Sequence, residues 1–217
     1  MDRKCFLFLL CMNISVSFIL LPDAPRRIVK VLKVSNGGSW GRWGITQFCA
    51  EGTYAVGYQL KIEQYQLNGD DTSLNAIALV CKDPDGVRYG GKVTSNQGIW
   101  GTWYNNASCH NIDGTPAFLT AFQLQVQRSV GEFDDTAANY VKFKCGDFGS
   151  VYKPFELASP PGHGHYGQMG DWSDSCPPMS AICGIKTRVE QPLTDGDDTA
   201  LNDVEFYCCV DNPDVGK

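Results

Sequence analysis

The sequence predicts an all-β protein built from three equal units and stabilised by disulfide bonds. Three observations support this prediction. The motif Asp-Asp-Thr-x-x-Asn recurs three times, stretches of alternating apolar and polar residues follow each other at regular intervals, and eight cysteines remain after an N-terminal leader. Outside that leader, no run of ten or more residues shows the i, i+3, i+4 periodicity of a helix, so we expect almost no helix.

The repeat length is about sixty-four residues. Asp71, Asp135 and Asp198 lie 64 and 63 residues apart, and the same intervals separate Asn75, Asn139 and Asn202, and also Cys81, Cys145 and Cys208. Each unit opens with a Gly/Trp cluster, at residues 39–44, 99–104 and 169–174, followed by Cys49, Cys109 or Cys176. Stacking the clusters aligns Trp43 with Trp103 and Trp172, and Gly41 with Gly101 and Gly170. The units are expected at about 28–90, 91–155 and 156–210.

Each unit also contains stretches with a period of two, which is typical of strands with one buried face. The faces expected to be buried are Tyr54, Val56, Tyr58, Leu60 and Ile62; Phe118, Phe122, Leu124 and Val126; and Ala181, Cys183, Ile185 and Val189. After each Asp-Asp-Thr, a second strand is expected to bury the Asn, two apolar residues and the Cys on one side. The segment from Ile28 to Val34 is the early strand that the family resemblance described below implies.

The first twenty-four residues read as a secretory signal. Arg3 and Lys4 precede an apolar run from Cys5 to Leu21 that is short for a membrane span, and we place cleavage between Ser15 and Ala24. No second apolar run of spanning length follows, so the mature chain, 25–217, is expected to be a single soluble, secreted domain. Its net charge of -6 and the lack of a Lys/Arg-rich run exclude a nucleic-acid binder.

Export makes disulfides the expected state of the eight remaining cysteines. Zinc is the alternative, but no Cys-x-x-Cys pairs or histidines lie at ligand spacing, so we expect no metal and no cofactor. Pairing within each unit gives Cys49–Cys81, Cys109–Cys145 and Cys176–Cys208. The extra pair, Cys183–Cys209, replaces Val56 and Lys82 of the first unit and Thr120 and Gly146 of the second.

The repeated aspartates have two interpretations. Asp and Thr before a strand commonly close a turn by accepting backbone N–H bonds, and a buried Asn can satisfy several backbone groups. A catalytic site, in contrast, normally needs one asymmetric group of residues. Repetition therefore favours the turn, although Asp71, Asp135 and Asp198 also remain candidates for sugar binding.

The three Gly/Trp clusters, three Asp-Asp-Thr-x-x-Asn strands and eight cysteines together resemble the vitelline membrane outer layer protein 1 family. The resemblance extends from about Ile28 to Cys209, and GDDTALNDVEFYCC is its most specific segment. It implies a β-prism of three four-stranded Greek-key sheets around a pseudo-threefold axis, one per repeat, with exchange of first and last strands allowed. The residues alone do not separate a prism from a trefoil. Members are secreted, with a link to egg coats and to transfer of N-acetylchito-oligosaccharides.

Three functions follow as hypotheses. The first is a non-catalytic component of an extracellular coat, whose acidic surface would suit basic coat proteins. The second is an oligosaccharide binder. Its exposed rings would come from the tryptophans beside glycines, Trp40, Trp43, Trp100, Trp103 and Trp172, with the aligned Trp43, Trp103 and Trp172 as the named candidates, although tryptophans at equivalent positions often pack in the core. The third is an enzyme on glycosidic bonds, which needs two carboxyl groups about 5–9.5 Å apart; Glu63 and Glu190 are the candidates, and the second unit has Gln127 instead.

Two smaller features complete the analysis. Asn106-Ala107-Ser108 is an acceptor for N-glycosylation in an exported chain. His163 and His165 lie in a Pro/Gly-rich insertion of the third unit and are too few for a metal site.

Overall fold

A computed structural model gives the fold of residues 26–66, 72–128, 136–149, 151–192 and 198–210. The expected signal segment, Asp71 and Asp135 lie outside these residues. Within the described part every regular element is a strand, as the periodicity predicts.

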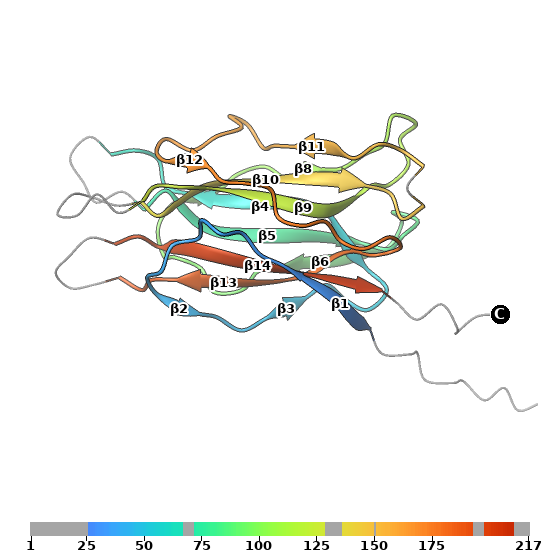
Figure 1. Cartoon of the computed structure of the whole chain (residues 1–217), viewed down its shortest axis with the longest axis horizontal. Helices are drawn as coiled ribbons and strands as arrows, with labels where there is room; N and C mark the ends of the chain where they lie inside the picture. Colours follow the sequence, from blue (N-terminus) through green and yellow to red (C-terminus); the bar gives the residue numbers. More distant parts are fainter. Residues whose placement is uncertain (1–25, 67–71, 129–135, 150, 193–197, 211–217) are drawn as a thin grey trace, which may run out of the picture.

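The strands form three antiparallel sheets, each built on a long central hairpin (Figure 1). The central hairpins are β4 (Tyr54–Ile62) with β5 (Leu74–Lys82), β9 (Phe118–Val126) with β10 (Ala138–Gly146), and β13 (Ala181–Val189) with β14 (Leu201–Val210). The peripheral strands are β1 (Arg27–Leu32), β2 (Arg42–Trp43), β3 (Gln47–Phe48), β6 (Tyr89–Val93), β7 (Thr102–Trp103), β8 (Ala107–Ser108), β11 (Phe155–Leu157) and β12 (Gln168–Met169).

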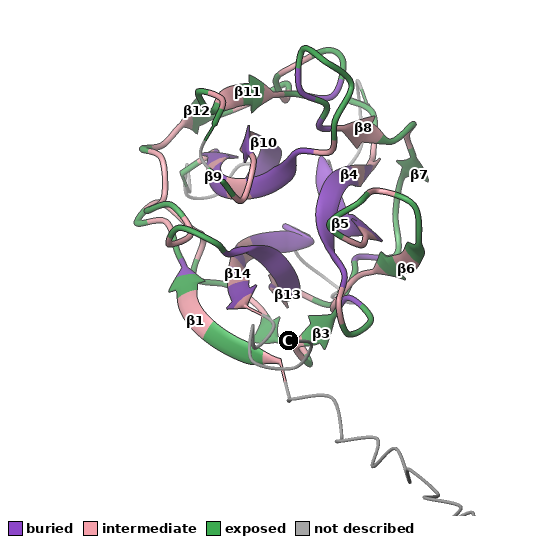
Figure 2. Cartoon of the chain, turned by 90° about the vertical axis from the view of Figure 1, so that its right-hand side faces the viewer, coloured by how far each residue is buried: buried purple, intermediate pink, exposed green. Residues whose placement is uncertain are grey.

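The strand orders are β6-β5-β4-β7, β11-β10-β9-β12 and β1-β14-β13-β2, with β8 and β3 adding to β4 and β13. Seen along the strands, the three hairpins surround a common axis and the peripheral strands lie outside them (Figure 2). This is the three-sheet β-prism that the sequence predicts. Each sheet takes the strands of a Gly/Trp cluster from the unit that follows, so β7 and β8 join β4, and the β13–β14 sheet combines both ends of the chain.

The core along the axis is made by aromatic rings from all three sheets. The Tyr58 ring lies 4.6 Å from that of Phe143, and the Phe206 ring contacts those of Phe143 and Phe122 at 5.1 and 4.8 Å. The hydroxyl of Tyr58 accepts the N–H of Ser159 at 2.8 Å, which satisfies its polar atom in the interior. The prism is therefore filled by side chains and has no open channel among these residues.

The faces of the first strands differ from the expected alternation because each strand carries a bulge. The bulged residues are Val56, Thr120 and Cys183, at the same position of each sheet. A bulge inserts one residue and reverses the facing of those before it. Ala55, Leu119 and Ile182 consequently join the axial core, whereas the predicted Tyr54, Val56, Phe118, Ala181 and Cys183 form a second cluster.

The disulfides connect the sheets in a ring. Cys49, Cys109 and Cys176 follow the peripheral strands of one sheet and bond Cys81, Cys145 and Cys208 in the central hairpin of the next. Cys183–Cys209 instead joins the two strands of one hairpin. These are the pairs expected from the repeat. In the chain-entropy model, closing loops of this length contributes about 3–4 kcal/mol for each bond.

A buried asparagine joins each hairpin to its connecting segment, the stretch that crosses from one edge strand to the other (33–41, 94–101 and 158–167). Asn75, Asn139 and Asn202 are fully buried bulge residues at the start of β5, β10 and β14. Their Oδ1 atoms accept the N–H groups of Trp100, Tyr166 and Trp40 at 3.2, 3.0 and 3.2 Å. Their Nδ2 atoms donate to the preceding Thr at 2.5–2.7 Å. We call this arrangement the asparagine clamp.

Asn202→Ala should lower the free energy of unfolding by about 2–4 kcal/mol, because the Trp40 N–H and the Thr199 hydroxyl lose a buried partner. Guanidinium unfolding with disulfides intact measures the change. Asn105→Ala, at an exposed position, is the control and should shift stability by less than about 0.5 kcal/mol. An Asn202→Ala protein as stable as the control would show that the clamp does not stabilise the prism.

Candidate functional site

The two carboxylates proposed for catalysis lie at the ends of β4 and β13 and hold the turns that follow. Glu63 Oε2 accepts the Thr72 hydroxyl at 2.6 Å and its N–H at 3.3 Å. Glu190 Oε2 makes the same two contacts with Thr199, at 2.6 and 3.3 Å. In the second sheet the amide oxygen of Gln127 accepts the Thr136 hydroxyl at 2.6 Å. The neutral amide of Gln127 and the carboxylates of Glu63 and Glu190 therefore accept the same hydrogen bond from the Thr of the turn.

The two catalytic candidates belong to different sheets, and each accepts hydrogen bonds within its own turn. Glu63 follows a strand of the β4–β5 sheet, and Glu190 follows a strand of the β13–β14 sheet. Each is occupied by its own Thr, and no contact between them is found in the described residues. The residue after each Thr, namely Ser73, Ala137 and Ala200, has φ of 51, 42 and 47°. The tight turn requires these left-handed conformations, which the sequence does not signal by glycine.

Of the three aspartates proposed for sugar binding, the structure describes only Asp198. It is 9% exposed and immediately precedes Thr199 of the turn. Its position fits the turn interpretation of the Asp-Asp-Thr motif, while the corresponding Asp71 and Asp135 are not described.

The register corrects the alignment of the Gly/Trp clusters. Trp43 pairs with Arg188, Trp103 with Lys61, and Met169 with Gln125, so Met169, not Trp172, is the counterpart of the first two tryptophans. Likewise Gly167, not Gly170, matches Gly41 and Gly101, because all three have φ of 74–75° against the end of the preceding long strand. The segment 158–167 is only one or two residues longer than 33–41 and 94–101, so the misalignment arose because Gly170-Asp171-Trp172 repeats the Gly-x-Trp pattern of Gly41-Arg42-Trp43.

The tryptophans lie on the outside of the prism rather than in the axial core. Trp43 and Trp103 are 36% and 39% exposed. The Lys186 ammonium lies 5.3 Å from the Trp43 ring centre and the Lys144 ammonium 4.5 Å from that of Trp172. A cation over the ring face occupies the surface on which a sugar would stack. The three predicted rings also belong to three different sheets and form no common site.

A better-placed aromatic residue is Trp40, in the connecting segment before the first cluster. Its side chain is 56% exposed and borders a cavity of 210 Å³ that is also lined by Gln127, Arg128 and Asn202. A neighbouring cavity of 550 Å³ shares Gln127 and Arg128 and extends to Met169. The sequence offered only the Trp-Gly pair as a signal for Trp40, since its neighbours come from distant strands.

A second cavity, of 150 Å³, lies at the end of the β4–β5 sheet beside the histidine insertion. Glu63, Tyr65, Tyr104 and His163 line it. The ring of Tyr65 stacks on that of His165 at 4.5 Å with an interplanar angle of 10°. No cluster of three or more metal-ligating side chains occurs in the described residues. The same residues include no helix with the length and apolar character needed to cross a membrane.

Asp203 is a carboxyl group with a strongly altered pKa, on the outer face of β14. Burial raises its pKa to about 6, with the charge of Glu205 acting in the same direction. The N–H of Val204, Arg188 and Lys33 oppose this shift. A Cβ at Gly37 would lie 2.2 Å from Cγ of Asp203, so the connecting segment covers this carboxyl group closely.

Sequence comparison places the chain among known proteins. A family model described as Vitelline membrane outer layer protein I (VOMI) matches residues 30–211. The chain belongs to this family. A vitelline membrane outer layer protein 1 homolog from Homo sapiens is 39% identical over 188 residues, covering 86% of each chain, and the homolog from Mus musculus is 38% identical over 185 residues, covering 85% of each.

Structure comparison of this VOMI-family chain finds solved structures that include lectins. A mannose-specific jacalin-related lectin from Morus nigra, in complex with mannose, has a TM-score of 0.47 at 12% identity and covers 88% of this chain and 98% of its own. Artocarpin, in a complex with mannopentose, has a TM-score of 0.45 at 12% identity and covers 82% and 95%.

Glu63→Gln and Glu190→Gln should leave the free energy of unfolding within about 0.5 kcal/mol of the parent, because Gln127 already holds the same turn with an amide oxygen. Glu190→Ala should lower it by about 1–2 kcal/mol, since the buried Thr199 hydroxyl loses its acceptor. Guanidinium unfolding compares the variants. If the Gln variants were as unstable as the Ala variant, the carboxylate charge would be needed and the turn interpretation would fail.

Asp203 should make stability fall as the pH rises from about 4 to about 6, because the native state keeps the proton that the unfolded state has lost. Asp203→Asn removes this effect. After allowance for its partial exposure, the variant should be about 1 kcal/mol more stable than the parent at neutral pH. Near pH 3.5 the two proteins should converge. Parallel pH profiles of parent and variant would contradict the assignment.

Proposed function

We propose that this chain is a secreted structural and binding component of an extracellular coat, acting through surface contacts rather than catalysis. The observation that carries the proposal is the equivalence of Glu63, Gln127 and Glu190 in the three turns. Glycosidic chemistry needs a pair of carboxyl groups facing one bond. Here both candidates bind backbone and hydroxyl groups of separate sheets.

Membership of the VOMI family and the ring of disulfides support an extracellular setting. Bonds that tie each sheet to the next hold the prism together outside the cell, where no reducing pool acts on them. The described chain also exposes Asn106, the N-glycosylation acceptor predicted from the sequence, between β7 and β8. Modification there would project from the outer face without disturbing the core.

The partners that fit this surface are basic coat proteins. The chain carries a net charge of -6, and opposite charge on a partner favours association most strongly at low ionic strength. A non-catalytic coat protein needs many modest contacts rather than one deep site. Exposed apolar side chains on more than one sheet, such as Ile28 on the β13–β14 sheet and Tyr89 and Trp103 on the β4–β5 sheet, are compatible with such contacts.

Oligosaccharide binding is the second candidate, because of the cavity beside Trp40. An exposed indole next to the guanidinium of Arg128 can stack on a sugar ring and bind its hydroxyls, in a cavity whose Gln127 and Asn202 side chains hold the turn and the asparagine clamp. This site uses Trp40 rather than the three aligned candidates Trp43, Trp103 and Trp172. Binding there would let the protein attach to a glycan of the coat without hydrolysing it.

The secreted, disulfide-intact chain should co-sediment with isolated egg-envelope coat material at low salt, and association should weaken several-fold at about 0.5 M salt because charge attraction is screened. Coat material whose lysines have been acetylated is the control and should bind much less. N-acetylchito-oligosaccharides incubated with the protein should show no longer or shorter products by mass spectrometry.

New oligosaccharide products that disappear in the Glu63→Gln, Glu190→Gln double variant would overturn the non-catalytic function. The same sugars separate the two candidates by calorimetry. Heat that is lost in Trp40→Ala but kept in Trp103→Ala, a substitution of another exposed tryptophan, would establish the glycan site. Coat binding unaffected by salt and by acetylation would contradict the acidic-surface mechanism.

A further inference from the structure

Two cavities at the end of the prism that carries the asparagine clamp occupy equivalent positions. In each sheet the N–H of the Glu or Gln after the first long strand binds the carbonyl of the left-handed turn residue at 2.8 Å, which aligns Glu63, Gln127 and Glu190. The cavity of 150 Å³ is lined by Glu63 and by residues of the connecting segment 158–167. The cavity of 210 Å³ is lined by Gln127 and by residues of the segment 33–41. The fold therefore forms the same place twice, with different side chains.

The charge of the second turn is opposite to that of the other two. The sequence reads Glu63-Gln64 in the first turn, Glu190-Gln191 in the third, and Gln127-Arg128 in the second. One negative charge is thus replaced by one positive charge. The turn does not require this change, because Gln127 accepts the Thr136 hydroxyl at 2.6 Å, as the two glutamates accept theirs. The reversed charge therefore points to what this place binds.

The amide of Gln127 is held in one orientation. Asn139 Nδ2 donates to the Thr136 hydroxyl at 2.5 Å, so this hydroxyl uses its own proton on Gln127 Oε1. Nε2 of Gln127 is therefore a donor, where the other two turns have a second carboxylate oxygen. An anion at the neighbouring Arg128 is not repelled from this side.

Arg128 lines two neighbouring cavities. The cavity of 210 Å³ and the cavity of 550 Å³ share Asn36, Val126, Gln127 and Arg128, and we call the two together the Arg128 groove. Of the described residues that line the groove, only Arg128 is charged. It is exposed and forms no ion pair with another described residue. A guanidinium without a partner, in a groove of the size of small-molecule sites, is suited to binding an anionic group.

The indole of Trp40 borders the same groove. It is 56% exposed, and among the described residues no cation or second ring stacks on it. Trp43 differs, because the Lys186 ammonium lies 5.3 Å from its ring centre. A sugar ring can therefore stack on the indole of Trp40.

The wall that carries Trp40 is fixed before a ligand binds. The Trp40 N–H donates to Asn202 Oδ1 at 3.2 Å. Asn36 Nδ2 donates to the Leu124 carbonyl of β9 at 2.9 Å. A preformed wall loses less entropy on binding than a mobile one.

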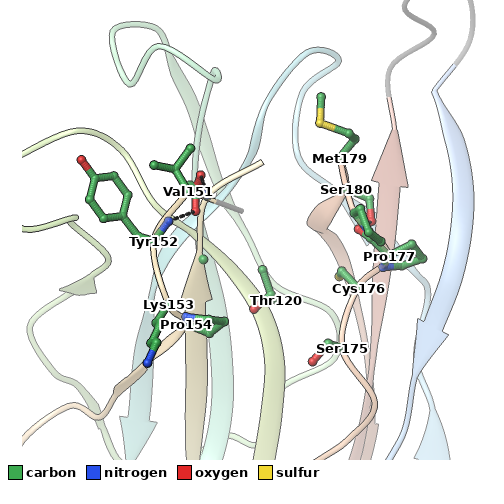
Figure 3. Close-up of a pocket in the computed structure, with 13 residues that line it drawn as sticks. Thr120, Val151, Tyr152, Lys153, Pro154, Ser175, Cys176, Pro177, Met179 and Ser180 are labelled. Carbon is green, nitrogen blue, oxygen red and sulfur yellow. Dashed lines mark hydrogen bonds between the residues drawn. The ribbon is translucent and has the colours of Figure 1, made fainter. Parts of the chain in front are cut away.

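The cavity of 330 Å³ on the outside of the β9–β10 sheet has none of the described charged side chains directed into it. Figure 3 shows the Lys153 ammonium pointing away from Thr120 and from the opposite wall. The Asp147 carboxylate accepts the Val151 N–H at 2.8 Å and so holds its own wall. The Arg128 groove is therefore the better candidate for a charged ligand.

We propose that the Arg128 groove binds an acidic sugar, a pyranose ring that bears a carboxylate or a sulfate, with the anionic group on Arg128 and the ring against Trp40. The inference deepens the oligosaccharide binding proposed above and rests on it for the sugar. The planar guanidinium can donate parallel hydrogen bonds to two oxygens of one anionic group. The net charge of -6 does not prevent binding, because at physiological salt charges beyond about 8 Å are screened.

The test uses three glucosides that differ only at C6: methyl β-D-glucuronide, methyl β-D-glucoside 6-sulfate and the neutral methyl β-D-glucoside. With the full, disulfide-intact chain, the NMR signals of the Trp40 indole N–H and the Arg128 amide should shift saturably. At least one acidic probe should bind about tenfold or more tightly than the neutral probe, and the tighter of the two identifies the anionic group. About 0.5 M salt should weaken only the acidic probes.

Arg128→Gln is the decisive variant, because Gln is the residue that the other two turns carry at this position. The affinity for the acidic probe should fall at least about tenfold, to the level of the neutral probe. Arg27→Gln removes the same charge at an exposed position of β1 and should bind the acidic probe as the parent does. Equal affinity for acidic and neutral probes, unchanged affinity in Arg128→Gln, or shifts that map to Thr120 and Gly146 would overturn the inference.

Failure of this inference and failure of the proposed function give different results. If N-acetylchito-oligosaccharides bind through Trp40 while acidic probes bind no better than the neutral probe, oligosaccharide binding stands and the preference for acidic sugars fails. If acidic probes bind through Arg128 while the chain does not co-sediment with coat material, the coat function fails and the groove stands.

Discussion

The prism depends on one buried amide, used three times. Each asparagine of the clamp holds the start of a central strand through its Nδ2 and the passing connecting segment through its Oδ1. That segment delivers the next peripheral strand to the sheet, and the cysteine after this strand bonds the hairpin of the neighbouring sheet. The start of each central strand, the peripheral strand at the sheet edge and the disulfide to the next sheet are thus coupled. Because a buried amide without partners is costly, losing any one of these contacts destabilises the others.

This coupling limits where function can be located. The residues that repeat in all three units, the Thr, the Asn and the Glu or Gln before them, are occupied by each other and by the backbone. Chemistry that needs free groups therefore has to come from positions at which the units differ. The structure contains such positions at the segment with His163 and His165, at the Cys183–Cys209 disulfide, and at the cavity lined by Thr120 and Gly146.

The sequence predicted the repeat, the strand content and the cysteine pairs, because equal spacing and period-two patterns survive without knowledge of tertiary contacts. It did not predict the bulges at Val56, Thr120 and Cys183, since an extra residue in a strand looks like ordinary alternation until its partner is known. It also misaligned Trp172, because two-residue strands carry no periodic signal and the nearest Gly/Trp pair was taken. The left-handed conformations of Ser73 and Ala200 could not be predicted either, because the turn and not the residue type imposes their φ.

The location of the tryptophans follows from the limited space around the axis of the prism. Six long strands converge there, and medium rings such as Tyr58, Phe143 and Phe206 already fill the space. An indole would overfill it, so the tryptophans lie in the peripheral strands and connecting segments, where they cover the sheets and keep part of their surface in water. The same constraint that excludes them from the core makes them available for contacts. A prism with rings on its outside can bind on several faces at once, which is what the proposed coat function would need.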